Sequence, residues 1–106
     1  MDFNHFLTSY MPDPSIGSKV HFQNMIDQAV LAEKLGYTTV SIPEHHLVNL
    51  LMMPSPLQMA VKIATLTKDI KISTSVAVLP LHDMRTYAGE VATADILTEG
   101  RLILGV

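Results

Sequence analysis

The sequence predicts an α/β fold of parallel βαβ units that forms the N-terminal half of a TIM-type (β/α)8 barrel, with about four strands and three helices. Short β-branched segments alternate with amphipathic helical segments along all 106 residues. This alternation repeats about every 30 residues, which suits βαβ units. The first strand-to-helix loop contains only Gly17 and no glycine-rich phosphate turn, so a dinucleotide-binding sheet is disfavoured. We therefore expect one partial barrel domain over residues 1–106.

The first two predicted strands flank a long amphipathic helix. Phe3–Thr8 is expected to form a strand, and the Met11-Pro12-Asp13-Pro14 run that follows is typical of turns. Apolar residues then recur at spacings of three and four over Lys19–Leu35, which predicts a helix. Gly36 stands where helices commonly end in the left-handed conformation. The β-branched run Thr38–Ile42 predicts the second strand.

The second half repeats the pattern with clear boundary signals. Ser55 is a candidate N-cap and Pro56 suits the first helical position, while Pro80 is expected to end a strand. The predicted elements are a helix over Ser55–Leu66, a strand over Ile70–Leu79, a helix over Met84–Leu97 and a strand over Leu102–Val106.

Side chains alternate between branched and small along the second and third predicted strands. We expect the branched set to pack on helices and the small or polar set to point inward, leaving room inside the barrel. The outward set is Val40, Ile42, Ile72, Thr74, Val76 and Val78, and the inward set is Thr39, Ser41, Ser73, Ser75 and Ala77.

Composition excludes several classes of function. The net charge is −3 and no basic run occurs, which disfavours nucleic acid and anionic membranes as partners. The chain has no Cys, so disulfides, thiolate nucleophiles and zinc–thiolate sites are excluded. The first residues lack the pattern of a signal peptide, and no apolar run reaches the roughly 18 residues of a membrane span. We expect a cytoplasmic protein.

Candidate chemistry lies where predicted strands end, because reactive groups of (β/α)8 barrels gather at that face. Glu44-His45-His46 follows the second strand and His82-Asp83 follows the third. Adjacent histidines point to opposite sides in extended chain, so one is expected to face the pocket and the other to make a structural hydrogen bond. Asp83 is expected to cap the third helix, and a histidine within the first strand, His5, to be an interior or rim residue.

In order and spacing, the chain resembles the bacterial luciferase-like flavin-dependent monooxygenases. The segments that carry the resemblance are Ser41–His46, Pro54–Leu57, Ile72–Asp83 and Ala94–Val106. Together they cover essentially the whole chain, although each motif alone is of modest specificity.

The resemblance implies a cofactor, a reaction and site residues. The cofactor would be reduced FMN, or a deazaflavin in some branches. Flavin members use O₂ to oxidise a small organic substrate, whereas deazaflavin members transfer hydride. His45 would be the acid–base residue beside the flavin, and a cis peptide would join Ser75 to Val76 under its ring. Glu44 and Ala77 complete the expected cofactor-binding residues, and no metal is expected.

Length and two departures bear on activity. A complete barrel takes about 250 residues and builds its phosphate site from later loops, so we expect this portion to be inactive alone. A second copy or a complementary half is expected to cover the open sheet. Met84 replaces the proline usual in the family after His82-Asp83, and Gly89 interrupts the third helix.

Two alternatives remain open at this stage. One is a non-catalytic, self-assembling half-barrel module. The weaker one is a metal-dependent barrel enzyme that uses Glu44, His45, His46 and His82.

Overall fold

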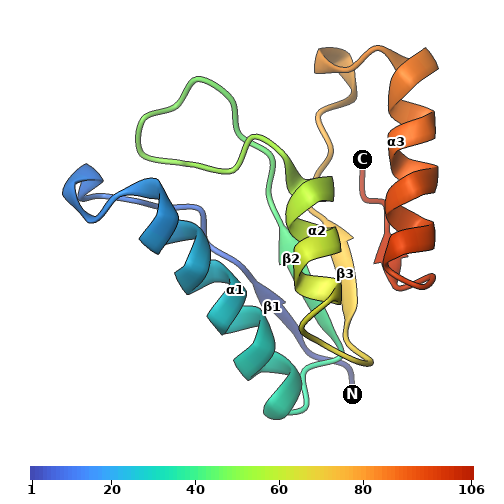
Figure 1. The fold of residues 1–106 in the computed structure, drawn as a ribbon, viewed down its shortest axis with the longest axis horizontal. Coiled ribbons are helices and arrows are strands. Elements are labelled where there is room, and N and C mark those ends of the chain that lie inside the picture. The colour runs from blue at the N-terminus through green and yellow to red at the C-terminus, as the bar shows by residue number, and fades with distance from the viewer.

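The computed structural model describes residues 1–106 and contains one parallel four-stranded sheet with the helices packed on one side (Figure 1). The sheet order is β1-β2-β3-β4, without reversal. The elements are β1 Asn4–Phe6, η1 Pro14–Ile16, α1 Ser18–Lys34, β2 Thr39–Ile42, α2 Pro56–Ala64, β3 Lys71–Thr74, η2 Leu79–Leu81, α3 Met84–Leu97 and β4 Leu102–Ile103.

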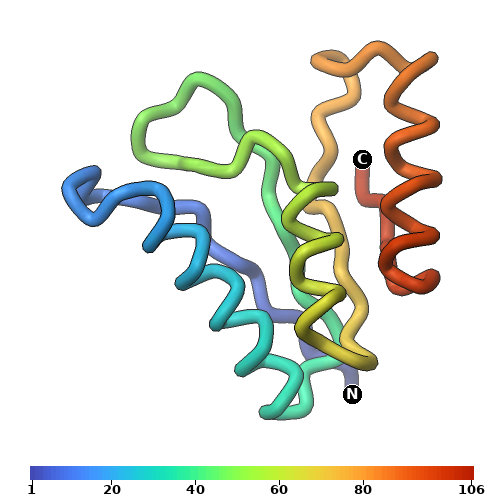
Figure 2. The backbone as a smooth tube through the Cα atoms, viewed as in Figure 1, coloured from blue at the N-terminus to red at the C-terminus, as the bar shows by residue number.

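The strand order distinguishes a barrel segment from a doubly wound sheet. Crossovers between parallel strands are right-handed, so a sheet that always grows in the same direction places every helix on the same face. A doubly wound sheet reverses direction and has helices on both faces. In the tube of Figure 2 the chain moves across the sheet in one direction from the N-terminus to the C-terminus. The predicted fold class is confirmed.

Strand register defines two faces of the sheet. The row His5, Val40, Ile72 and Leu102 faces the helices, and Val40 and Ile72 are completely buried there. The neighbouring row points to the opposite side, here called the inner face, and consists of Phe6, Ser41, Ser73 and Ile103. Phe6 is 51% exposed and Ile103 is 42% exposed, so the apolar ends of the inner row are open.

The hydrophobic core lies between the sheet and helices α1 and α2. It holds fourteen buried residues, which come mainly from the helix-facing strand row and the facing sides of the helices. Burying one Leu or Ile side chain stabilises a fold by about 1.5–3 kcal/mol, so this layer supplies the main favourable term. The predicted outward positions Val40, Ile42 and Ile72 all belong to it.

The third strand is much shorter than the predicted Ile70–Leu79. Ladder pairing ends at Thr74, although the Ser75 N–H still donates to Ile42 O at 2.8 Å. The Ser75–Val76 peptide bond is cis, as the resemblance implied. Beyond it the predicted alternation is wrong, because Val76 is half exposed whereas Ala77 is buried. The chain has left the extended ladder there, so a two-residue period no longer applies.

The other boundaries differ by a few residues. Strands β1 and β4 are shorter than Phe3–Thr8 and Leu102–Val106 because ladder pairing with β2 and β3 covers only Asn4–Phe6 and Leu102–Ile103. Helix α2 ends at Ala64 rather than Leu66, and the Thr65 and Thr67 hydroxyls then donate to backbone carbonyls of its last turn.

The predicted helix caps are largely confirmed. Gly36 has a φ of 87° just after α1, a conformation that glycine adopts without steric penalty. Asp83 caps α3 by accepting from the Arg85 N–H at 3.0 Å. Ser55 occupies the N-cap position of α2, but its side chain makes no capping hydrogen bond. None of the helices is long and apolar enough to cross a membrane.

Candidate functional site

A buried carboxylate organises the carboxyl end of the sheet. Glu44 follows β2 and its side chain is completely buried. Its Oε1 lies 2.6 Å from His46 Nε2 and 2.6 Å from His82 Nε2, and its Oε2 accepts from the Val78 N–H at 2.9 Å. Residues from the loops after β2 and β3 therefore meet on one side chain, as their positions after neighbouring parallel strands predicted.

The charge state of Glu44 fixes the protonation of its partners. Burial alone would raise the pKa of this carboxyl, but hydrogen bonds from His46, the Val78 N–H and His82 outweigh it and the pKa is lowered. An ionised carboxylate only accepts hydrogen bonds, so both Nε2 atoms must carry a proton. In a neutral imidazole this leaves Nδ1 as an acceptor.

Tyr87 of α3 closes the cluster from the helix side. Its ring stacks on His82 with a centroid distance of 4.0 Å and an interplanar angle of 21°. Its hydroxyl is buried without a hydrogen-bond partner. Burial and the negative charges of Glu44 and Glu90 raise its pKa, so the phenol stays protonated at neutral pH.

His45 is separated from this cluster by the direction of its side chain. Its backbone N–H donates to Met53 O at 2.9 Å, and its half-buried ring lines a cavity of about 420 Å³ formed by the loops after β1 and β2. Its neighbour His46 is held on Glu44 instead. The expected division, one histidine at a pocket and one in a structural hydrogen bond, is therefore confirmed.

The segment expected to lie near a cofactor comes directly after β3. Ser75 is partly exposed, Val76 is 50% exposed, and Ala77 is buried with its N–H donating to Gly105 O at 2.8 Å. The Val78 N–H bonds Glu44, so this segment is fixed to the histidine cluster.

Gly105 holds the end of β3 from the other side. Its N–H donates to Thr74 Oγ1 and its carbonyl accepts from the same hydroxyl, both at 2.9 Å. A Cβ added to Gly105 would lie 2.2 Å from Thr74 O, so only glycine fits this approach.

The remaining histidine, His5, lies on the helix-facing row. Its Nε2 is 3.2 Å from Gln28 Oε1 of α1, and its ring packs edge-on against Tyr37. It is thus an interior residue of the helix layer, as expected, and does not join the cluster.

Of the four residues considered as metal ligands from the sequence, only Glu44, His46 and His82 lie close enough together to hold one ion. Ligand atoms of Glu44, His46 and His82 lie within 4.8 Å of one another, and His45 is not among them. Two His and one Glu form a known zinc ligand set. Here, however, the two Nε2–Oε1 contacts are hydrogen bonds to one shared oxygen.

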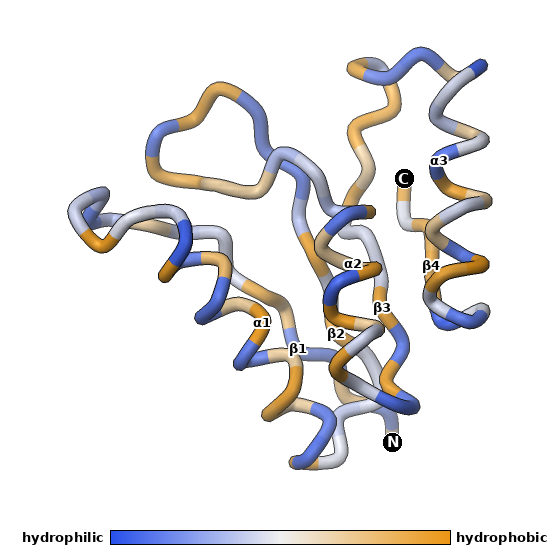
Figure 3. Tube along the Cα trace, in the orientation of Figure 1, coloured by the Kyte–Doolittle hydropathy of each residue, from blue (hydrophilic) through white to orange (hydrophobic).

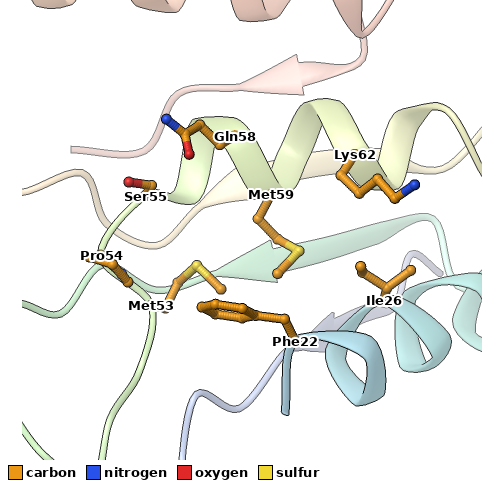
Figure 4. A pocket seen from close by; sticks show the side chains of 8 residues that line it. All are labelled: Phe22, Ile26, Met53, Pro54, Ser55, Gln58, Met59 and Lys62. Carbon is orange, nitrogen blue, oxygen red and sulfur yellow. The ribbon is translucent and has the colours of Figure 1, made fainter. Parts of the chain in front are cut away.

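A second hollow, between α1 and α2, has a different character. Its volume is about 310 Å³, and Figure 4 shows Phe22, Met53 and Met59 grouped along it. Lys62 is the one lining residue with a fixed charge, and no His, Asp or Glu lines it. It continues the hydrophobic core and offers no group for chemistry.

Sequence reasoning missed two members of the cluster. Tyr87 gave no motif signal, although it lies one turn after the capping Asp83 and therefore close to His82. The Val78 N–H could not be foreseen because a ladder-forming strand was expected there.

Comparisons with known proteins agree with this geometry. The family model described as luciferase-like monooxygenase matches residues 1–106. An uncharacterized protein of Sinorhizobium fredii is 37% identical over 106 residues, and the chain covers 30% of its length. The oxygenase component of a flavin-dependent trigonelline monooxygenase from Acinetobacter baylyi is 31% identical over 85 residues, which are 80% of this chain and 24% of the relative.

A solved structure extends the similarity to the fold. The oxygenating constituent of 3,6-diketocamphane monooxygenase from Pseudomonas putida, in complex with FMN, superimposes with a TM-score of 0.90 at 26% identity. The match covers 98% of this chain and 28% of that protein, so the chain spans less than a third of the proteins it matches here. The chain belongs to the luciferase-like monooxygenase family.

Proposed function

We propose that this chain is the N-terminal portion of a flavin-dependent monooxygenase that uses reduced FMN and O₂ on a small organic substrate, and that it is inactive alone. One observation carries the proposal. Glu44 is bonded both to the two histidines and to the Val78 N–H, so acid–base groups and the Ser75–Val76 segment share the carboxyl end of the sheet. That end is where (β/α)8 enzymes build their active sites.

The residues fit the ring of a flavin. Val76 offers a half-exposed apolar side chain, and Ser75 before it is small. Ser73 and Ser41 on the adjacent inner row are small as well, which leaves space beside this segment. The FMN complex of the diketocamphane relative favours FMN over a deazaflavin.

The phosphate of FMN requires groups from elsewhere. None of the proposed site residues is Lys or Arg. Phosphate sites of such barrels are usually built by loops after the later strands. We therefore assign only the ring-facing wall to these residues.

The protein's own groups would then divide the proton chemistry. Bound reduced flavin supplies the electrons for O₂ chemistry. His45 is the proposed acid–base residue, because its ring lines the open cavity instead of being held on Glu44. Glu44 acts as a positioning residue, since it fixes the orientation and tautomer of His46 and His82.

The open inner face supports a role for a complementary surface. Phe6 and Ile103 remain about half exposed on it, whereas parallel sheets of this type are normally covered on both faces. We propose that the rest of a barrel, or a second copy of the chain, covers it in a cytoplasmic protein.

Flavin titration tests the proposal. The complete protein that contains these residues and the 106-residue chain are each titrated with oxidised and reduced FMN, while light scattering reports mass. We expect saturable binding by the complete protein and none by the monomeric chain. Absence of binding by the complete protein in both redox states would refute the proposed function, and oxygen-dependent turnover by the chain alone would refute its inactivity.

A further inference from the structure

The buried carboxylate of Glu44 has no cation of fixed charge beside it. Its side chain is completely buried, and its only ion-pair partners are His46 and His82. The third hydrogen-bond donor is the backbone N–H of Val78, which is neutral. With neutral imidazoles the group of three side chains therefore carries one net negative charge. A buried charge of this kind is unfavourable unless a cation offsets it, so this position attracts cations.

Three potential ligand atoms converge at this position. The Nε2 atoms of His46 and His82 each lie 2.6 Å from Glu44 Oε1, and all three ligand atoms lie within 4.8 Å of one another. Zn²⁺ binds imidazole nitrogen and carboxylate oxygen at about 2.0–2.2 Å, so its tetrahedral ligand atoms are roughly 3.3 Å apart. Each imidazole therefore has to move back from Oε1 by less than about 1 Å to admit the ion. The side chains of His46 and His82 are 33% and 21% exposed, so neither ring is enclosed by the core.

Contacts outside the three side chains hold them in place. The Val78 N–H binds Glu44 Oε2 at 2.9 Å and leaves Oε1 for the shared contact. Tyr87 stacks on His82 with a centroid distance of 4.0 Å, which fixes the plane of that ring. In Figure 3 the chain turns hydrophilic just after β2, at residues 44–46, before the apolar part of the loop. Outer contacts of this kind orient metal ligands and commonly change metal affinity by about 10–100-fold.

We propose that Glu44, His46 and His82 form a binding site for one divalent transition-metal ion, with Zn²⁺ as the probe. The ion takes the place of the two Nε2 protons, and each imidazole then carries its proton on Nδ1, so no proton is lost. Water fills the fourth position of the tetrahedron. The occupied site joins the loops after β2 and β3 through bonds to one ion. The inference goes beyond the proposed function, and the resemblance to the family implied no metal.

The ligand types decide which cations the site accepts. Two imidazoles and one carboxylate suit Zn²⁺ and its first-row neighbours, whereas Mg²⁺ and Ca²⁺ prefer sets made of oxygen atoms. The chain has no Cys that could form a competing thiolate site. His45, although adjacent to His46, does not belong to the group of ligand atoms. We therefore expect Zn²⁺ to bind in preference to Mg²⁺, and His45 provides an internal control.

Calorimetric titration of the complete, untagged protein with zinc chloride tests the inference, at pH 8 and without FMN. His46→Gln should weaken Zn²⁺ binding at least about tenfold, a difference of about 1.4 kcal/mol. The adjacent His45→Gln is the matched control and should retain the Zn²⁺ affinity of the parent protein. Equal affinities of His46→Gln and the parent protein, or displacement of Zn²⁺ by Mg²⁺ at equal concentration, would overturn the inference.

Co²⁺ reports the geometry of the bound ion. Four-coordinate Co²⁺ absorbs visible light strongly, whereas six-coordinate Co²⁺ absorbs weakly. We expect a strong spectrum for the parent protein and for His45→Gln, and its loss in His82→Gln and Glu44→Gln. A weak spectrum that none of these variants changes would overturn the inference. His46 does not stack on Tyr87, so His46→Gln gives the same test if His82→Gln does not fold.

FMN titration of the same samples separates the inference from the proposed function. Zn²⁺ binding that His46→Gln weakens, together with no FMN binding by the parent protein, would support the metal site and count against the proposed function. FMN binding without Zn²⁺ binding would support the proposed function and count against the metal site.

Discussion

Two carboxylates at opposite ends of the sheet receive similar numbers of hydrogen bonds from very different donors. At the amino end, Glu33 of α1 accepts from the backbone N–H groups of Lys68, Asp69 and Ile70 at 2.7–3.1 Å. At the carboxyl end, Glu44 accepts from two imidazoles and one backbone N–H. In each case burial opposes ionisation, and the hydrogen bonds still lower the pKa.

The difference lies in what the donors can do next. Backbone N–H groups do not titrate near neutral pH, so Glu33 serves only to hold the loop before β3 against α1. Nearby, Arg101 ties the same region by donating to Ala64 O, Thr67 Oγ1 and Thr98 O. Glu44 instead joins side chains from the loops after β2 and β3 to the Val78 N–H, beside the segment proposed to face the flavin. The amino end thus fixes α1 to the loop before β3, whereas the carboxyl end carries the proposed site.

The largest expected effect is that of His45→Ala, which tests the proposed role of the carboxyl end in the complete protein. Loss of a general acid–base group is expected to slow oxidation of the organic substrate by about 10²–10⁴-fold, with little change in thermal stability. His5→Ala, on the helix-facing row, is the control and should leave the rate unchanged. The measurement is the turnover rate with reduced FMN and O₂, and an unchanged rate for His45→Ala would remove its proposed role.

Two glycine variants test how closely the chain packs at the carboxyl end of β3, with Gly105 at the close approach and Gly89 in α3 as the comparison. Gly105→Ala should lower the free energy of unfolding by about 1–3 kcal/mol, because its Cβ would overlap Thr74 O. Gly89→Ala in α3 meets no atom within 4 Å and should raise that free energy by about 0.5–1 kcal/mol. Urea unfolding of both variants measures these changes. Similar free energies of unfolding for the two variants would mean that Gly105 does not lie against Thr74 O in the folded protein.

At the amino end, Glu33→Ala should destabilise without touching the chemistry. Removal of a charged acceptor from three backbone donors is expected to cost about 2 kcal/mol. FMN affinity should be unchanged, and Asp95→Ala on the exposed side of α3 provides the control. Chemical denaturation measures the stability and flavin titration measures the FMN affinity. Loss of FMN affinity in the folded Glu33→Ala variant would contradict a purely structural role for the amino end.

The smallest expected effect is a shared sensitivity to acid. Both carboxyls have folded-state pKa values below the ordinary 4.5, so their stabilisation is complete above about pH 4.5 and is lost as the pH falls below it. Glu44→Gln should reduce this loss and leave the part due to Glu33. Urea midpoints at pH 6 and pH 4 measure it, and an identical pH response of the variant and the parent protein would exclude Glu44 as a source.

Much of the architecture could be predicted because local signals agreed with the tertiary fold. Apolar spacing identified α1, glycine identified its end, and Asp83 was recognised as a cap. The predicted end of β3 was wrong because a β-branched residue occupies every second position from Ile70 to Val78, whereas the ladder stops at Thr74. Pairing with neighbouring strands, not propensity, decides where a strand ends.

The candidate site was predictable in its parts and less so in its connections. Glu44 and His82 follow neighbouring parallel strands, so they were expected to lie close together. His45 and His46 are adjacent in an extended segment, so their side chains were expected to point to opposite sides. The stacking of Tyr87 and the bond from Val78 depend on how α3 and η2 return over the sheet, and no periodicity encodes that.

The one-way strand order has a consequence for how such a protein can grow. Each βα unit adds its strand to the edge left by the previous one and its helix to the same outer side. The free backbone of β4 can therefore accept another unit without rearrangement of β1–β3. A chain built in this manner lengthens by repetition of one unit, and eight such units make the closed ring of a (β/α)8 barrel.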